Sequence, residues 1–318
     1  AVHALLDAVD GQDFASIDEQ AEILRKMHRG EAAVDELRRA LKDKQGQVRR
    51  GAATALGRLG SDAKTAVPAM IEAMDDPDEA VRRTTVSALE QIGTDAVIAL
   101  IDALSSDDAH TRELAAELLG SLGPEANAAI PALLAAMMDP EAAVRREATE
   151  SVSEMGQQAV PTVITALSSD DARIRQAAAT ALGELGADAP RAVPALIASL
   201  HDDEDGVISS AADALASFGL AAAAAIPTLL ELVQEKDNSV NVWLARAVWK
   251  ISQQSESAVP ALTKALQDDE THVRLLAARF LGEIGPPAPS AMAELTEALD
   301  DVDDDVAHEA AKALSQID

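Results

Sequence analysis

The chain has 318 residues, of which 48% are apolar, yet only 2% are aromatic and none is cysteine. Without cysteine it forms no disulfide and holds neither an Fe–S cluster nor a cysteine-ligated zinc ion. A formal net charge of −29 and an isoelectric point near 4.4 oppose binding to nucleic acid and to anionic membranes, because both depend on clustered Lys and Arg side chains.

Targeting signals are not evident in the sequence. No apolar run approaches the length that predicts a membrane span, and no basic segment precedes an apolar core as in a signal peptide. Together with the absence of cysteine, this favours a cytoplasmic location. The chain begins inside an expected helix and ends inside a repeat, so we expect it to be a fragment of a longer protein.

A helix-pair repeat is expected from the first residues onward. Residues 1–30 fit a degenerate pair, with helices expected at 1–9 and 17–28. From there a Val-Arg pair, or a variant of it, recurs at steps of 33, 30, 33, 30 and then four times 33 residues. Such a period is typical of a two-helix repeat that buries its apolar face against its neighbours. The first residues of these marks are 48, 81, 111, 144, 174, 207, 240, 273 and 306.

Each unit has the same internal order. A first helix carries Val-Pro or Ile-Pro, and the recurrence of proline at one register indicates a helix start or a bend. An Asp-rich turn then supplies N-caps for the second helix. In that helix, apolar residues at +4, +7, +8 and +11 from the mark form a stripe of helical period. A glycine closes the helix and is expected in a left-handed C-cap. The loops after Gly93 and Gly156 are three residues shorter than the others.

The pattern resembles HEAT repeats, in particular the subclass also found in phycobilisome lyases, over essentially the whole chain. Its most specific element is an Asp and an Arg six residues apart at the turn. The resemblance implies that these residues form a structural ladder between neighbouring repeats. The pairs are Asp43/Arg49, Asp76/Arg82, Asp139/Arg145 and Asp268/Arg274, with a weaker ladder at Ser106/Arg112 and Ser169/Arg175 and none at Asp202/Ile208, Glu235/Asn241 and Asp301/Ala307.

We therefore predict an all-α, right-handed α-solenoid of about ten helix pairs, forming one array over residues 1–318. The resemblance implies that the second helices line its concave surface. Positions +2, +6 and +9 of these helices fall between the apolar positions and are expected to face solvent. In units seven and eight they hold Val242, Trp249 and Leu275, flanked by Arg246 and Arg279, which predicts an exposed ridge that binds a partner. The alternative is that Trp249 folds over Gly282 and has a packing role.

A second set of exposed positions carries mixed charge. Position +2 or +6 holds Arg50, Arg83 and Arg146, opposed by Glu113, Glu117 and Glu150. We interpret this row as a solvated helix face, with a site for a charged peptide as the alternative.

No catalytic or metal-binding motif emerges. The six histidines lack the i, i+4 spacing of a helical zinc pair, and the single His308-Glu309 dipeptide cannot build a di-iron site. We expect a non-enzymatic, monomeric scaffold without cofactor or metal, which binds a protein or peptide and neither nucleic acid nor membrane. The alternatives are a bilin-lyase-like or other HEAT-fold enzyme and a structural spacer within a larger protein.

Overall fold

The computed structural model describes residues 30–186, 189–235, 239–286 and 288–317, and every element in these ranges is a helix. The degenerate first pair expected at residues 1–30 lies outside them, apart from Gly30. The helices group into two compact units, residues 1–159 and 160–318. The repeat pattern runs through both units and itself gives no sign of this division.

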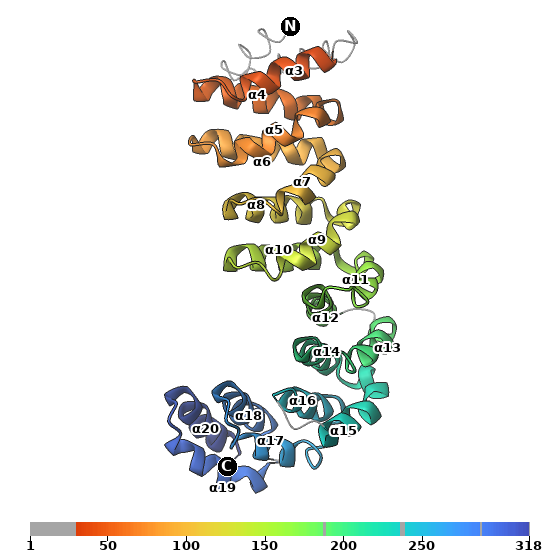
Figure 1. Ribbon diagram of the computed structural model, residues 1–318, viewed down its shortest axis with the longest axis vertical. Coiled ribbons are helices and arrows are strands. Elements are labelled where there is room, and N and C mark those ends of the chain that lie inside the picture. Colours follow the sequence, from red (N-terminus) through yellow and green to blue (C-terminus); the bar gives the residue numbers. More distant parts are fainter. Residues whose placement is uncertain (1–29, 187–188, 236–238, 287, 318) are drawn as a thin grey trace. The chain divides into compact units, whose positions relative to one another are not determined.

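The first unit contains four described helix pairs, each with a first and a second helix. The first helices lie in one layer and the second helices lie side by side in another (Figure 1). The pairs are α3 (Gly30–Ala40) with α4 (Gly46–Leu59), α5 (Val67–Glu72) with α6 (Glu79–Ile92), α7 (Val97–Ala103) with α8 (Ala109–Ser121), and α9 (Ile130–Ala136) with α10 (Ala142–Met155).

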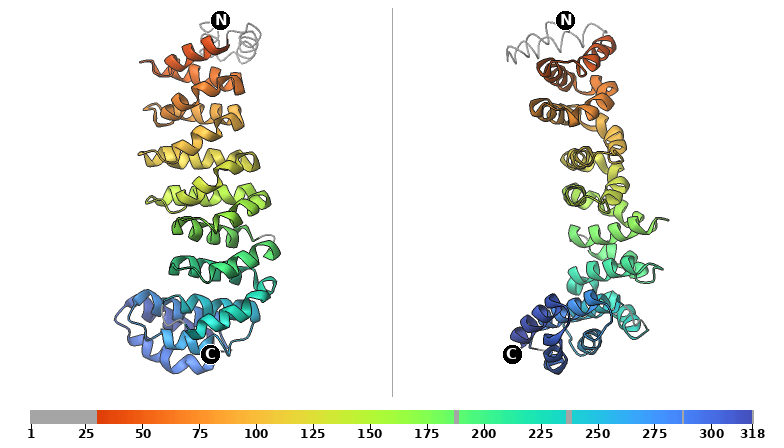
Figure 2. Two further views of the ribbon diagram at one scale, coloured as in Figure 1. Left: turned by 45° about the vertical axis from the view of Figure 1, so that its right-hand side comes forward. Right: turned by 60° about the vertical axis from the view of Figure 1, so that its left-hand side comes forward.

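The second unit contains five pairs in the same two layers, and the two further views show the same stacking of its second helices (Figure 2). The pairs are α11 (Val160–Ala166) with α12 (Ala172–Leu185), α13 (Ala189–Ser199) with α14 (Asp205–Ser217), α15 (Ile226–Glu235) with α16 (Asn241–Ser252), α17 (Val259–Ala265) with α18 (Thr271–Ile284), and α19 (Met292–Glu297) with α20 (Asp304–Ile317). The α-solenoid fold predicted from the repeat is confirmed.

The ends of the helices follow the predicted signals. Proline stands in the first turn of α5, α9 and α17, where its missing N–H costs no hydrogen bond, so it marks a helix start. Pro194 is the exception, inside α13. The carboxylates of Asp78, Asp108 and Asp171 accept N–H bonds from the first turns of α6, α8 and α12, which confirms the N-caps.

The closing glycines all have positive φ, as predicted, but most are not in the left-handed helical region. Gly60, Gly93, Gly156 and Gly285 combine φ of 59–71° with ψ between −132° and −148°. This region is almost restricted to glycine. Gly186, with ψ of −3°, is a left-handed cap. Each of these glycines leads into a 3₁₀ segment. The segment that begins at Gly60 has seven residues, whereas those that begin at Gly93 and Gly156 have four and three, in agreement with the shorter loops.

Consecutive second helices pack most closely where small residues meet. A Cβ atom on Gly57, at position +9, would lie 2.8 Å from the Cα atom of Ala88, at position +7 of the next pair. Gly120 meets Ser151 in the same way, and Gly282 meets Ala313. Where position +9 holds glycine it therefore lies between helices, which corrects the expectation there, whereas Glu90 and Ser153 at the same position are exposed as expected.

Candidate functional site

In four turns the Arg joins two consecutive helix pairs, but not through the carboxylate six residues before it. Arg49 donates from Nη1 to the backbone carbonyl of Asp43, at 2.8 Å. Its Nε and Nη2 atoms donate to the carboxylate of Asp76, in the next pair, at 2.6 and 2.7 Å. The same carboxylate accepts the backbone N–H of Asp78 at 2.9 Å, which fixes the turn. One Asp thus holds both its own turn and the preceding pair.

Four complete rungs of this kind are present in the described residues, and they differ from the predicted ones. The paired residues stand 27 positions apart, in consecutive pairs. Arg112 and Arg175, predicted to be weak because Ser precedes them, make full two-bond contacts. Asp202 and Asp301 each accept two hydrogen bonds from the Arg of the preceding pair, although no Arg stands six residues after either Asp and no ladder was predicted there. The rungs are Arg49–Asp76, Arg112–Asp139, Arg175–Asp202 and Arg274–Asp301.

Two predicted ladder arginines lack a carboxylate partner among the described residues. Arg82 and Arg145 donate to the carbonyls of Asp76 and Asp139, each at 2.7 Å, and form no ion pair. In the pair after Arg82, the turn position that would hold the accepting Asp is Ser106, and in the pair after Arg145 it is Ser169. Both pairs begin with one of the two shortened loops. The aspartates Asp43 and Asp268 contribute a carbonyl to an Arg and use their carboxylates to fix their own turns.

The rungs shift the ionisation of both partners. The hydrogen bond from Arg112 lowers the pKa of Asp139 below its ordinary value, and burial partly opposes this shift. The same contact raises the pKa of Arg112. Both side chains are about 90% buried, with exposed fractions of 11% and 10%. The side-chain bonds of these residues are thus made within the chain, between consecutive helix pairs.

The predicted ridge in units seven and eight is only partly exposed. Val242 is 1% exposed and belongs to the buried cluster that also contains Val259, Val273 and Ala277, so its predicted place on an exposed ridge is wrong. Trp249 is half-buried and packs against this cluster, while Leu275 is half-buried. A Cβ atom on Gly282 would face α20, where it would meet Ala313 and Gln316.

Arginines 246 and 279 have different surroundings. Arg246 lies with its guanidinium carbon 4.9 Å from the centre of the Phe280 ring and forms ion pairs with Asp213 and Glu283. Arg279 is exposed, without an ion pair among the described residues. The structure therefore separates the five predicted residues into a buried set, a paired arginine and a solvated one.

Bulky side chains explain why this part of the array differs. Between α16 and α18, Trp249 and Phe280 occupy the positions where the closely packed helices α12 and α14 have Gly183 and Ala214. The backbones of α16 and α18 approach less closely than those of the other consecutive second helices in the second unit. Trp243 is half-buried and packs edge-on against Phe280 with 5.3 Å between ring centres.

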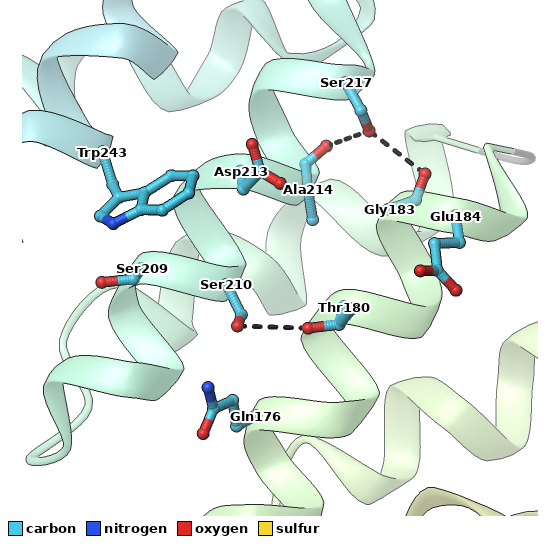
Figure 3. A pocket seen from close by; sticks show the side chains of 10 residues that line it. All are labelled: Gln176, Thr180, Gly183, Glu184, Ser209, Ser210, Asp213, Ala214, Ser217 and Trp243. Carbon is cyan, nitrogen blue, oxygen red and sulfur yellow. Dashed lines mark hydrogen bonds between the residues drawn. The ribbon is translucent and has the colours of Figure 1, made fainter. Parts of the chain in front are cut away.

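A groove of the second unit lies next to this aromatic cluster. It holds about 480 Å³ and runs across α12 and α14, with Trp243 of α16 at one end (Figure 3). We call it the α12–α14 groove. Its polar side chains occupy positions +2, +6 and +10 of the two helices. Its lining residues are Gln176, Thr180, Gly183, Glu184, Ser209, Ser210, Asp213, Ala214, Ser217 and Trp243.

The groove combines hydrogen-bonding groups with one aromatic ring. Thr180 and Ser210 join its two helices by a hydroxyl–hydroxyl bond of 3.2 Å (Figure 3). Gln176 and Ser209 also line it, and among the described residues their side chains form no hydrogen bond with protein. Glu184 stands in the wall, where desolvation raises its pKa. The lining contains carboxylates and hydroxyls but no Lys or Arg.

The α12–α14 groove lies on the helix face that the sequence predicted to be exposed, but in other pairs than the predicted ridge. Positions +2 and +6 were expected to face solvent, and Gln176, Thr180, Ser209 and Asp213 at these positions do line the groove. These small polar residues have no distinctive composition, so they gave no signal. Trp243, six residues before Trp249, is the lining residue with a distinctive side chain.

Two further features bear on function. No helix in the described ranges is both long and apolar enough to cross a lipid bilayer. Within those ranges, no group of three or more His, Asp or Glu residues is arranged to hold a metal ion.

Solved structures with the same fold are α-solenoids that are longer than this chain. Kap121p is 14% identical and aligns with 99% of this chain and 41% of its own length, with a TM-score of 0.60. Importin beta is 17% identical and aligns with 98% of this chain and 50% of its own, with a TM-score of 0.51. This chain therefore spans about half or less of these relatives. Kap121p has also been solved bound to the extreme C-terminus of the protein phosphatase Cdc14p.

A shorter relative is the CpcE–CpcF complex of phycocyanin lyase from Nostoc sp. PCC7120, which is 26% identical over 70% of this chain and 94% of its own, with a TM-score of 0.42. None of the curated protein sequences matches this chain. The HEAT repeat family model matches residues 3–76, 34–120, 67–153, 130–216 and 226–315, which together span nearly the whole chain. The chain belongs to the HEAT repeat family.

Proposed function

We propose that this chain is a non-catalytic scaffold that binds an extended segment of a partner protein in the α12–α14 groove. The observation that carries the proposal is the pairing of free hydrogen-bonding side chains with an aromatic ring in one open groove. Its volume of about 480 Å³ lies within the range of about 300–1,000 Å³ that is usual for ligand sites.

The lining groups suit a peptide backbone. An extended peptide carries an N–H donor and a carbonyl acceptor at every residue, and these must find partners when they leave water. The Gln176 amide and the Ser209 hydroxyl can each donate and accept, and in the described part of the chain neither forms a side-chain hydrogen bond. Two polar groups from different helices therefore face the same bound segment.

The ring and the charges favour a particular kind of side chain. Trp243 is half-buried, so part of its indole remains free for an apolar or cationic group of the partner. Glu184 supplies a carboxylate, whereas the charge of Asp213 is balanced by Arg246. With a net charge of −29 on the whole chain, a segment with apolar and basic side chains is favoured over an acidic one.

Related solenoids support the general role. Kap121p and importin beta share the fold, and Kap121p has been solved with bound proteins. These likenesses support a protein-binding solenoid without identifying a partner.

A peptide-display selection tests the proposal. A random peptide library is selected on the full chain, and enriched peptides are titrated against the chain and two variants. Ser209→Trp fills the groove, and Ser168→Trp places the same ring at an exposed position of the same unit, outside the groove. We expect the enriched peptides to carry apolar and basic residues and to lose affinity for Ser209→Trp alone. Equal binding to both variants contradicts the proposed site.

The alternatives give different results in the same experiment. A structural spacer enriches no peptide. A bilin-lyase-like enzyme binds a bilin instead, which shows as a shift in the bilin absorption spectrum that Ser209→Trp abolishes.

A further inference from the structure

A second groove lies on the second-helix face of the first unit and has the opposite charge. It holds about 400 Å³ between α4 and α6. We call it the arginine groove. Its polar lining includes Arg50, Arg58, Arg83, Thr54, Thr84 and Ser87, and no Asp or Glu takes part in it. In a chain with 55 acidic and 26 basic residues, a groove with three arginines and no acid is a local reversal of charge.

The arginines differ in how far they are engaged within the protein. Arg50 is half-buried and, among the described residues, its guanidinium forms no ion pair or hydrogen bond. Arg83 is mainly exposed and pairs with one carboxylate, that of Glu79, at 3.5 Å. Arg146, predicted to belong to the same row, pairs with two carboxylates, those of Glu113 and Glu147, at 3.6 Å each. The row is therefore not uniform, because its third member lies among carboxylates.

One hydroxyl group adds a donor beside the guanidinium groups. Thr54 and Thr84 belong to the lining, but each donates its hydroxyl proton to the carbonyl one turn earlier in its own helix, at 3.1 and 2.7 Å. These two hydroxyls therefore do not supply donors to a ligand. Ser87 forms no hydrogen bond among the described residues, so its O–H is available as a donor. A group with several acceptor oxygens is the complement of this set.

From this geometry we infer that the arginine groove binds a phosphorylated segment of a partner protein. A phosphoserine or phosphothreonine carries nearly two negative charges and three acceptor oxygens, which matches guanidinium groups that approach from two helices. The groove is open along the helix face, so the peptide on either side of the phosphate continues across α4 and α6.

The neighbouring pairs restrict the ligand to a compact anion. The same face of α8 and α10 carries Glu113, Glu117, Glu147 and Glu150. Desolvation and these like charges raise the pKa of Glu147 above its ordinary value. A nucleic acid strand that left the arginine groove toward α8 would therefore meet repulsion, whereas a single phosphate on a peptide would not.

Fluorescence anisotropy with the full chain tests the inference. The probe is a short fluorescein-labelled peptide of Gly and Ala that carries adjacent phosphoserines, and its controls contain Ser or Glu at those positions. We expect the phosphopeptide to bind at least about tenfold more tightly than either control at physiological ionic strength. Equal binding of the Glu peptide overturns the assignment to phosphate.

Variants locate the site. Arg50→Gln combined with Arg83→Gln removes two accessible charges from the groove, and Arg146→Gln removes one accessible charge outside it. We expect affinity for the phosphopeptide to fall about tenfold or more in the double variant and to change less than about twofold in Arg146→Gln. Equal losses would indicate general electrostatic attraction and overturn the site. Circular dichroism checks that each variant is folded.

Two further measurements separate this site from other possibilities. Single-stranded poly-uridine RNA is titrated in the same buffer, and binding as tight as that of the phosphopeptide would favour a nucleic acid and overturn the inference. The Ser209→Trp variant, which fills the groove of the other unit, is expected to bind the phosphopeptide normally.

Discussion

Arg112 and Asp139 stand 27 residues apart in the sequence, yet two hydrogen bonds of 2.8 and 2.9 Å join the guanidinium to both carboxylate oxygens. The contact spans from the start of α8 to the turn before α10, so it fixes the spacing of consecutive pairs at their turn end. At the other end, Gly120 meets Ser151 and fixes the spacing through steric contact. A charged rung and a glycine contact thus hold the same two helices.

Loss of a rung is expected to cost more than loss of an arginine that bonds only to carbonyls. Arg112→Ala removes both bonds to Asp139 and leaves a carboxylate that is about 90% buried. We expect the free energy of unfolding to fall by about 2–4 kcal/mol. Arg145→Ala, the matched control in the next pair, removes bonds to two backbone carbonyls, and we expect about 1 kcal/mol. Urea denaturation measures both, and equal losses would contradict the assignment of the rungs.

The rungs also predict how stability depends on pH. In the folded state the hydrogen bond from Arg112 lowers the pKa of Asp139, and Asp76, Asp202 and Asp301 are lowered by their own arginines. Unfolded Asp titrates near about 3.9. The folded chain therefore binds fewer protons, so the stabilisation is complete above that pH and is lost as pH falls through the folded pKa values.

The measurement compares the melting temperatures of the natural chain and Arg112→Ala from about pH 6 down to about pH 2.5. We expect the difference between them to narrow toward low pH, because protonation of Asp139 removes the rung from both. A difference that stays constant over this range would show that the carboxylate does not supply the stabilisation.

Glu147 predicts the opposite dependence. Its pKa is raised, mainly by desolvation and then by Glu150 and Glu117, so the ionised side chain is less favourable in the folded state. The stabilisation that the protonated Glu147 side chain contributes to the folded state is fully present below the unfolded pKa of about 4.3. It is lost as the pH rises through the folded pKa. Glu147→Gln is therefore expected to raise the melting temperature at neutral pH and to leave it nearly unchanged near about pH 4. A variant that is less stable at neutral pH would contradict this.

Glycines at position +9 give a graded prediction. In a helix interior, Gly→Ala gains about 1 kcal/mol from propensity. At Gly57 the new Cβ would lie 2.8 Å from the Cα atom of Ala88, so backbone must move, and we expect a net loss of about 1–3 kcal/mol. At Gly183 the distance to the Cα atom of Ala214 is 3.0 Å, so a smaller shift suffices and the net change is expected near zero. Thermal unfolding of the two variants measures the difference.

The fold could be predicted from the sequence because its determinants are periodic. The recurring Val marks, the closing glycines and the shortened loops each act within one repeat. The ladder was assigned to the wrong partners because the six-residue spacing corresponds to a carbonyl contact. The 27-residue spacing that joins Arg175 to Asp202 becomes evident only when consecutive pairs are stacked.

The binding surface was harder to predict because exposure depends on the distance between neighbouring helices. Val242 and Leu275 occupy the same position in consecutive pairs, yet the first is buried and the second is half-exposed. That difference arises where Phe280 replaces a small residue and separates α16 from α18. A single sequence does not reveal how bulky side chains change the spacing of helices that are 33 residues apart.

The two tryptophans decide between the ridge predicted from sequence and the groove found in the structure. Trp243 lines the α12–α14 groove, whereas Trp249 packs against the core between α16 and α18, with Lys250 over its ring at 4.5 Å.

With a peptide obtained by display, we expect Trp243→Ala to weaken binding by about tenfold, as is usual when an aromatic anchor is removed. Trp249→Ala combined with Leu275→Ala is expected to lower stability by about 2 kcal/mol or more and to leave the affinity of the folded fraction unchanged. Isothermal titration below the melting temperature of each variant separates the two effects. If the double variant loses the peptide and Trp243→Ala retains it, the partner site lies on the ridge of units seven and eight, and the groove is not the site of binding.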